Sequence, residues 1–446
     1  MKKPELLVPA GNLEILKTAV MYGADAVYIG GELYGLRAKA KNFGPDQMKE
    51  GIDFAHEHGV KVYVTANITA HNRDIAGIRE YFTELKQIRP DALIISDPGV
   101  FTIAREICPE IDIHVSTQAN NVNYETYNFW YKLGAKRVVS ARELSLAETK
   151  EIRNHIPDDL EIESFVHGAM CISYSGRCLL SSFMTGRDAN LGACTHPCRW
   201  KYSLEGKNPV TGELEDFTLS SSSQRDEQEE IEDFNYSPDK FFLEEEKRRG
   251  EFFPVAENER GTYIFNSKDL CMIEHIPELI DAGINSFKIE GRMKPALYVA
   301  VVASVYREAI DDYLTDPMLY NSKLPAYREA ISKCSHRRFY TGFYFGRPNE
   351  DGQLYSGNVT EKDAVYLGFV ESVDGNGYVC MTQKNKFNVG EKLDVMRPHT
   401  ESFEVIVEDM LDENGEHIDS CPHAEQKIRV RFSRQLEEWD IVRRVE

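Results

Sequence analysis

Four of the nine cysteines lie close together in HGAMCISYSGRCLLSSFMTGRDANLGACTHPCRW, residues 167–200. Their spacing is Cys171-x6-Cys178-x15-Cys194-x3-Cys198, and Cys271 follows later in the chain, at the predicted start of the seventh helix. Only the last pair has the short separation that is typical of zinc ligands. Iron–sulfur clusters accept irregular thiolate spacing, because different cysteines bind different irons. The residues alone leave three interpretations open: an iron–sulfur cluster, a zinc site, or buried and redox-active cysteines.

Charged residues in KIEGRMK, residues 288–294, form a second set that could do chemistry. On a strand, Lys288, Glu290 and Arg292 point the same way, because side chains alternate between the two faces. The Arg292 guanidinium suits a carboxylate or a phosphate, which it can bind with two parallel hydrogen bonds. The alternative is an arginine–glutamate ion pair that stabilises the fold. Arg37 and Lys39 in LRAKAKNF form a similar cationic set.

His167 and His196 lie beside the cysteines and are candidate ligands or acid–base groups. A lone histidine is more often held by ordinary hydrogen bonds, so this alternative stays open for both.

Short β-branched runs alternate with amphipathic helical patterns, which predicts strands followed by helices. The predicted strands are 5–11, 26–31, 61–68, 92–99, 112–118, 137–143, 160–168 and 286–292. Eight such units are typical of an α/β fold of the (β/α)8 TIM-like barrel type. An open doubly wound sheet also alternates in this way, but the expected GxGxxG is missing after the first strand, where PAGN stands.

In a (β/α)8 barrel, the residues just past each strand line the active face. Here these residues are Asn12, Gly31, Asn67, Asp97, Gln118, Arg142, His167 and Arg292. The alternative is that they cap the helices that follow.

The sequence predicts two domains. Residues 1–315 form the barrel, with an insertion after the seventh strand at about 169–265 that carries the cysteines and an acidic segment, 224–260. Residues 316–339 are interpreted as a connector. From residue 340 to 446, short strands with Gly, Asn and Asp turns predict a small antiparallel β-barrel.

Composition gives the chain the character of an ordinary globular protein, with 42% hydrophobic and 28% charged residues. The formal charge of −21 argues against a protein that coats nucleic acid, although it leaves room for a local basic patch. We find no signal peptide and no run of 18 apolar residues, so we expect a cytoplasmic protein without membrane contact. Thiols stay reduced in that compartment.

The stretch ESFVHGAMCISYSGRCLLS resembles the signature of the collagenase-like peptidase family of unknown catalytic type, E-x-F-x-x-G-[SA]-[LIVM]-C-x4-G-x-C-x-[LIVM]-S. ELLVPAGN, LRAKAKNF, SKDLC and KIEGRMK are also similar to segments of this family. The signature positions are Glu163, Phe165, Gly168, Ala169, Met170, Cys171, Gly176, Cys178, Leu180 and Ser181.

The resemblance is strongest to a family branch that forms 5-hydroxyuridine at the wobble position of tRNA and depends on prephenate. It implies a [4Fe–4S] cluster on Cys171, Cys178 and Cys194, with Cys198 or Cys271 as the fourth ligand. The expected partners are a tRNA anticodon loop and a small carboxylated metabolite. The expected catalytic residues are Arg292, Glu290 and His167, and the expected binding residues are Arg37, Lys39, Gln118 and again Arg292.

Two alternatives remain beside tRNA hydroxylation. A peptidase would need an activated nucleophile or a metal-bound water, such as a low-pKa cysteine or a zinc site. The other alternative is a non-catalytic, cluster-bearing subunit of a modification complex. The acidic segment departs from the compact pattern of the family.

Overall fold

The computed structural model covers the barrel, the C-terminal domain and separate parts of the region between them. The described residues are 3–36, 42–171, 173–175, 177–185, 187, 189–191, 193–199, 205–207, 214–216, 241–244, 252–258, 261–263, 267–348, 352, 361 and 363–445. The predicted binding residues Arg37 and Lys39 lie outside them.

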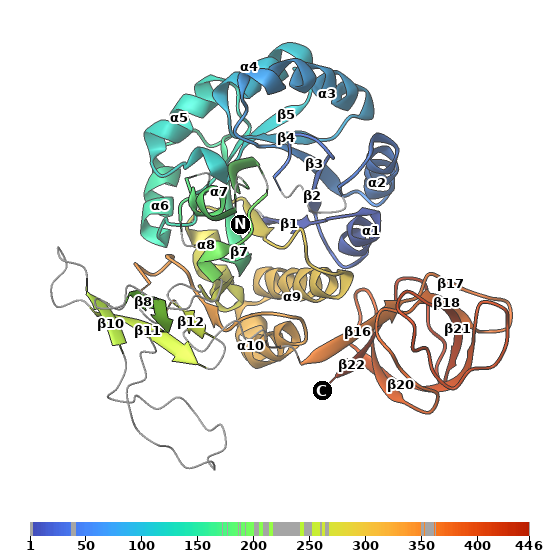
Figure 1. Cartoon of the computed structure of the whole chain (residues 1–446). Coiled ribbons are helices and arrows are strands. Elements are labelled where there is room, and N and C mark those ends of the chain that lie inside the picture. Colours follow the sequence, from blue (N-terminus) through green and yellow to red (C-terminus); the bar gives the residue numbers. More distant parts are fainter. Residues whose placement is uncertain are drawn as a thin grey trace.

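Eight parallel strands close into a barrel, as predicted (Figure 1). The strand order is β14-β1-β2-β3-β4-β5-β6-β7, and β14 also pairs with β7. Most of the strands end earlier than the sequence pattern suggested. Their bounds are β1 (Glu5–Pro9), β2 (Ala26–Gly30), β3 (Lys61–Ala66), β4 (Ala92–Ile95), β5 (Asp112–Val115), β6 (Arg137–Val139), β7 (Glu161–Ala169) and β14 (Ser286–Ile289).

Helices surround the barrel and bury the outer face of its strands (Figure 1). Asn12 and Asp97 each accept a hydrogen bond from the backbone of the helix that follows, so the capping interpretation holds for these two residues. The helices are α1 (Leu13–Met21), α2 (Pro45–Glu57), α3 (Ile75–Ile88), α4 (Pro98–Ile107), α5 (Tyr124–Lys132), α6 (Leu146–Asn154), α8 (Ile276–Asp281) and α9 (Ala296–Thr315).

Strand β7 extends beyond its pairing with β6, and its last residues pair antiparallel with β13 (Asp269–Cys271). Strand β15 (Phe339–Tyr340) pairs in turn with β13. We expected Cys271 at the start of a helix, and this expectation was wrong. Cys271 lies on a strand, opposite His167, because the open edge of β7 offers it a backbone partner.

The predicted insertion contains the short helix α7 (Leu180–Thr185) and several short strands. β8 (Glu205–Lys207) pairs with β9 (Leu214–Asp216), and β11 (Phe252–Asn258) pairs with both β10 (Phe241–Glu244) and β12 (Gly261–Tyr263). Parts of the acidic segment therefore form an antiparallel sheet.

The predicted connector contains a helix, α10 (Pro317–Ser332), which packs beside α9. None of the helices in the described part of the chain combines the length and the apolar character needed to cross a membrane.

The C-terminal domain is a seven-stranded antiparallel sheet in the order β16-β22-β19-β20-β21-β18-β17. Near the end of β18, the Lys384 amide donates to the Leu367 carbonyl of β16 at 2.8 Å, so the sheet curls back on itself. The strands are β16 (Ala364–Phe369), β17 (Ser372–Val373), β18 (Val379–Thr382), β19 (Lys392–Met396), β20 (Phe403–Leu411), β21 (Lys427–Phe432) and β22 (Ile441–Val445).

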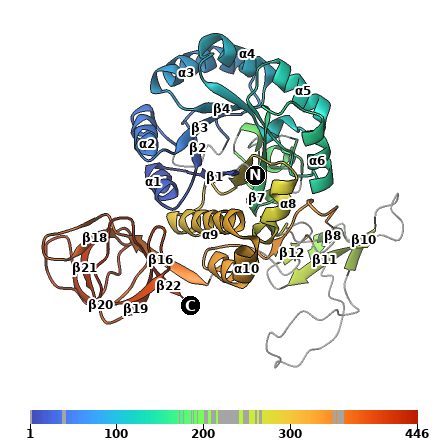
Figure 2. The same cartoon turned by 180° about the vertical axis from the view of Figure 1, so that it is seen from behind.

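The C-terminal domain has its own hydrophobic core and attaches to the barrel through α1. The Tyr22 hydroxyl, at the end of α1, lies 2.9 Å from the carbonyl oxygens of both Met396 and Trp439. Figure 2 shows this domain and the strands of the insertion on opposite sides of α9 and α10.

Candidate active site at the barrel mouth

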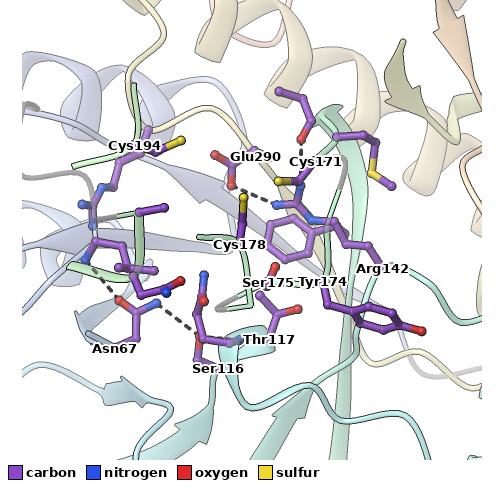
Figure 3. Close-up of a pocket in the computed structure, with 18 of the residues that line it drawn as sticks. Asn67, Ser116, Thr117, Arg142, Cys171, Tyr174, Ser175, Cys178, Cys194 and Glu290 are labelled. Atoms are coloured by element: carbon purple, nitrogen blue, oxygen red, sulfur yellow. Dashed lines mark hydrogen bonds and ion pairs between the residues drawn. The ribbon is translucent and has the colours of Figure 1, made fainter. Parts of the chain in front are cut away.

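A cavity of about 190 Å³ opens at the carboxyl ends of the barrel strands (Figure 3). This is the end at which (β/α)8 enzymes carry their active sites. The polar and thiol side chains that line it come from β2, β3 and β14, from the loops after β3, β5, β6 and β14, and from the segment after β7. They are Tyr28, Thr65, Asn67, Ser116, Thr117, Gln118, Arg142, Cys171, Tyr174, Ser175, Cys178, Ser181, Asn190, Cys194, His196, Cys198, Lys288, Glu290 and Arg292.

Cys171, Cys178, Cys194 and Cys198 line this one cavity, although 26 residues lie between the first and the last. Figure 3 shows the first three thiols around the same space as Glu290 and Arg142. Cys271 does not line the cavity. Its Sγ lies 3.9 Å from the Tyr306 hydroxyl, and burial raises the pKa of its thiol to about 11.

Hydrogen bonds fasten the cysteine segment, residues 171–199, to the barrel. Asn120, which follows β5, donates to the Ser175 carbonyl at 2.7 Å and accepts from Nε of Arg177 at 2.6 Å. The Thr69 amide, in the loop after β3, donates to the Asn190 carbonyl at 3.1 Å. The barrel rim therefore positions both halves of the segment.

Within the segment, Ser181 joins α7 to the loop that carries Cys194. Its buried hydroxyl donates to the Arg187 carbonyl at 2.7 Å and accepts from the Thr195 amide at 3.1 Å. His196 has a φ of +57°, and its backbone N–H points to Sγ of Cys194 at 3.4 Å.

Cationic side chains also line the cavity. Arg142 donates to the Ala169 carbonyl at 2.7 Å, lies 3.4 Å from Oε2 of Glu290 and covers the Phe165 ring. Arg292 is buried and donates to the Thr65 hydroxyl at 2.9 Å. Lys288, Glu290 and Arg292 all line the cavity, as predicted, but β14 ends at Ile289, so only Lys288 does so from the strand itself.

Two glycines leave the space that Arg292 occupies. A Cβ on Gly30 would lie 2.3 Å from Nη1 of Arg292, and a Cβ on Gly11 would lie 2.2 Å from the Arg292 carbonyl oxygen. Gly30 therefore leaves room for the Arg292 guanidinium, and Gly11 leaves room for the Arg292 backbone.

Beneath the cavity, the barrel lumen holds a layer of paired charges, which we call the floor. Arg137 bridges Glu5 (2.5 Å), Glu161 (2.6 Å) and Glu163 (3.1 Å). Lys288 reaches Glu163 at 2.6 Å. Burial alone would raise the pKa of the Glu5 carboxyl, but the charge and hydrogen bonds of Arg137 hold it below its usual value.

His167, on β7, is buried and does not line the cavity. A register shift in the pairing of β7 with β14, just before His167, interrupts the strand alternation there. Its ring lies among Tyr298, Tyr306 and Phe339, and burial lowers its pKa to about 3. The surroundings are those of a packed neutral histidine, and its catalytic role stays a prediction without support from the cavity.

Of the other predicted residues, Gln118 lines the cavity together with Glu290 and Arg292. The sequence analysis missed Ser116, Thr117 and Tyr174. Position alone could have found them, because the first two follow β5 directly and Tyr174 lies between Cys171 and Cys178.

A single metal ion would need ligands that converge on one point, since Zn–S bonds are only about 2.3 Å long. Among the described residues, no three His, Cys, Asp or Glu side chains converge in this way. The four cysteines instead surround a space, which suits a larger object with several metal atoms better than one zinc ion.

Comparison with known proteins gives two matches to family models. Residues 11–354 match the model of peptidase family U32, and residues 362–443 match the model of the peptidase family U32 C-terminal domain.

Several curated relatives are similar over nearly the whole chain. A tRNA hydroxylation protein of Bacillus subtilis is 37% identical over 99% of this chain and 95% of its own length. The tRNA hydroxylation protein P of Escherichia coli is 41% identical over 95% of this chain and 92% of its own length. A 23S rRNA 5-hydroxycytidine synthase of Escherichia coli is 34% identical over 69% of this chain and 39% of its own length. The chain is therefore a member of peptidase family U32, similar to the family's tRNA hydroxylation proteins.

Proposed function

We propose that this protein hydroxylates RNA, and that its product is 5-hydroxyuridine at the wobble position of tRNA. The observation that carries the proposal is the gathering of Cys171, Cys178, Cys194 and Cys198 around a cavity that Arg142 and Arg292 also line. Relatives that are named as tRNA hydroxylation proteins and as a 23S rRNA 5-hydroxycytidine synthase support the same reaction class.

We assign the four cysteines of the mouth as ligands of a [4Fe–4S] cluster. The donor set consists of thiols only, and the thiols surround a space instead of meeting at a point. Cys198 is then the fourth ligand, because it lines the cavity and Cys271 does not. Such a cluster supplies electron transfer when it is bound.

The chain's own residues bind and orient the reactants. The guanidinium groups of Arg142 and Arg292 suit the carboxylates of prephenate or a related acid, since both line the cavity. Gln118, Asn67 and Ser116 offer amide and hydroxyl groups near the same space, where they can hydrogen-bond the edge of a uracil. A base reaches this depth only when it is turned out of its stack.

The family name raises the peptidase alternative, which needs a zinc-bound water or an activated nucleophile. The described residues contain no converging set of three zinc ligands, and so hydroxylation remains the better supported function.

The proposal is tested by nucleoside mass spectrometry of tRNA from a bacterial strain without its own hydroxylation proteins. The wild-type chain should restore 5-hydroxyuridine, and Cys171→Ala should not. Cys380→Ala, in β18 of the C-terminal domain, is the matched control and should restore it fully. Full restoration of 5-hydroxyuridine by Cys171→Ala would contradict the proposal. Full restoration by a double variant, Arg292→Met with Glu290→Gln, would indicate that the protein is a non-catalytic subunit.

A further inference from the structure

Several exposed apolar side chains lie in the cysteine segment, which lines part of the cavity. Within the cysteine segment, Phe183 is 84% exposed and Leu179 is 68% exposed. Tyr174 and Met184 of the same segment are also exposed, and Tyr174 lines the cavity. We call these four residues the rim patch. Among the described large hydrophobic side chains, that of Phe183 is the most exposed.

Exposed apolar side chains that cluster on a folded protein usually mark an interaction site. The rim patch does not complete the barrel, since the hydrophobic core lies beneath it and is closed by the strands and helices. The patch lies in the same segment as the four cysteines that line the cavity, so a large substrate that reaches them would meet it.

The charge around the patch identifies the kind of partner. The whole chain carries a formal charge of −21, yet residues 171–199 contain three arginines and one acidic residue. Arg177 and Arg187 are exposed beside α7. Exposed aromatic rings next to arginines are the combination by which proteins bind single-stranded nucleic acid, with rings stacking on bases and cations facing phosphates.

We propose that the rim patch docks an unpaired RNA loop, with Phe183 stacking on a base that neighbours the target and Arg177 and Arg187 facing the backbone. The inference rests on RNA being the substrate, as proposed above. Stacking at the rim would compensate the lost stacking of the base that enters the cavity. It would also explain why a strongly acidic protein keeps a basic segment at this position.

The test measures the affinity of the full-length protein for a fluorescently labelled anticodon stem–loop with a wobble uridine, at one fixed salt concentration. Phe183→Ala should weaken binding roughly tenfold, and Phe183→Trp should restore it, because tryptophan also presents a ring face. Phe129→Ala is the matched control, since Phe129 is 51% exposed on α5, away from the rim patch. It should bind as the wild type does.

A second variant combines Arg177→Gln with Arg187→Gln. In a plot of log affinity against log salt concentration, its slope should be shallower by the amount that corresponds to roughly two phosphate contacts. Wild-type affinity in Phe183→Ala would overturn the proposal. So would the loss of a co-purifying protein from Phe183→Ala while RNA binding stays intact, because the patch would then dock a protein.

The two proposals fail in different ways. If the wild-type chain neither binds the stem–loop nor restores 5-hydroxyuridine, the proposed function is wrong. If it does both and Phe183→Ala does so equally well, only the docking surface is wrong.

Discussion

The floor and the mouth of the same barrel are built in opposite ways. At the floor, Arg137 and Lys288 are buried and paired with three glutamates. At the mouth, thiols surround a cavity and Phe183 stands in solvent. Lys288 belongs to both regions, because it pairs with Glu163 and also lines the cavity. We infer from this comparison that the paired charges of the floor stabilise the barrel, whereas the proposed catalytic residues lie at the mouth.

Removing one charge from the floor should have the largest effect on stability. Glu163→Gln leaves Arg137 and Lys288 buried with less compensation, and it should lower the free energy of unfolding by about 3 kcal/mol. Urea unfolding of the purified chain measures this change. Glu106→Gln, which breaks the exposed pair with Arg79, is the control and should leave the unfolding midpoint where it is. Equal midpoints for both variants would show that the floor does not stabilise the barrel.

The floor should also make the fold sensitive to acid. Burial, together with the positive charges of Arg137 and Lys288, holds the pKa of His114 well below its usual value of 6.5. The unfolded chain takes up this proton as the pH falls below 6.5, and the folded chain does not. His114 should therefore cost the fold about 1.4 kcal/mol for each pH unit below 6.5.

His114→Gln removes this titration, so the stability of the variant should fall less steeply between pH 6.5 and pH 5 than that of the wild type. Denaturant unfolding at several pH values gives both slopes. Parallel slopes would mean that His114 keeps an ordinary pKa in the fold.

At the mouth, a change of one methyl group should alter binding more than stability. Gly30→Ala puts a Cβ in the space of the Arg292 guanidinium, and it should weaken the binding of prephenate roughly tenfold through lost charge-assisted hydrogen bonds. Isothermal titration calorimetry measures the affinity. Gly375→Ala, at a position where a Cβ meets nothing within 4 Å, is the control. Unchanged affinity in Gly30→Ala would show that Arg292 does not bind prephenate.

The barrel was predictable from the sequence because its strands and helices repeat a local pattern eight times. The helix α10 was not predicted, because Pro325 lies inside it and proline usually interrupts a helix. The C-terminal domain was predictable from its turns and short strands.

The site was predictable only where chemistry shows in the sequence. The four cysteines and Arg292 stand out by type and spacing. The positions of His167 and Cys271 depend on the register shift in β7 and on its pairing with β13, and strand β13 follows β7 by about a hundred residues. Neither contact leaves a local pattern. The rim patch could not be predicted for a related reason, because the exposure of a side chain depends on what the rest of the fold covers.

The most direct test of the account is the metal content of the protein purified without oxygen, compared between the wild type, Cys198→Ala and Cys271→Ala. We expect about four irons and four sulfides per chain in the wild type and in Cys271→Ala, and a loss of both in Cys198→Ala. One zinc per chain without iron, or iron that is lost from Cys271→Ala and kept in Cys198→Ala, would contradict the assignment of the cluster to the four cysteines of the mouth.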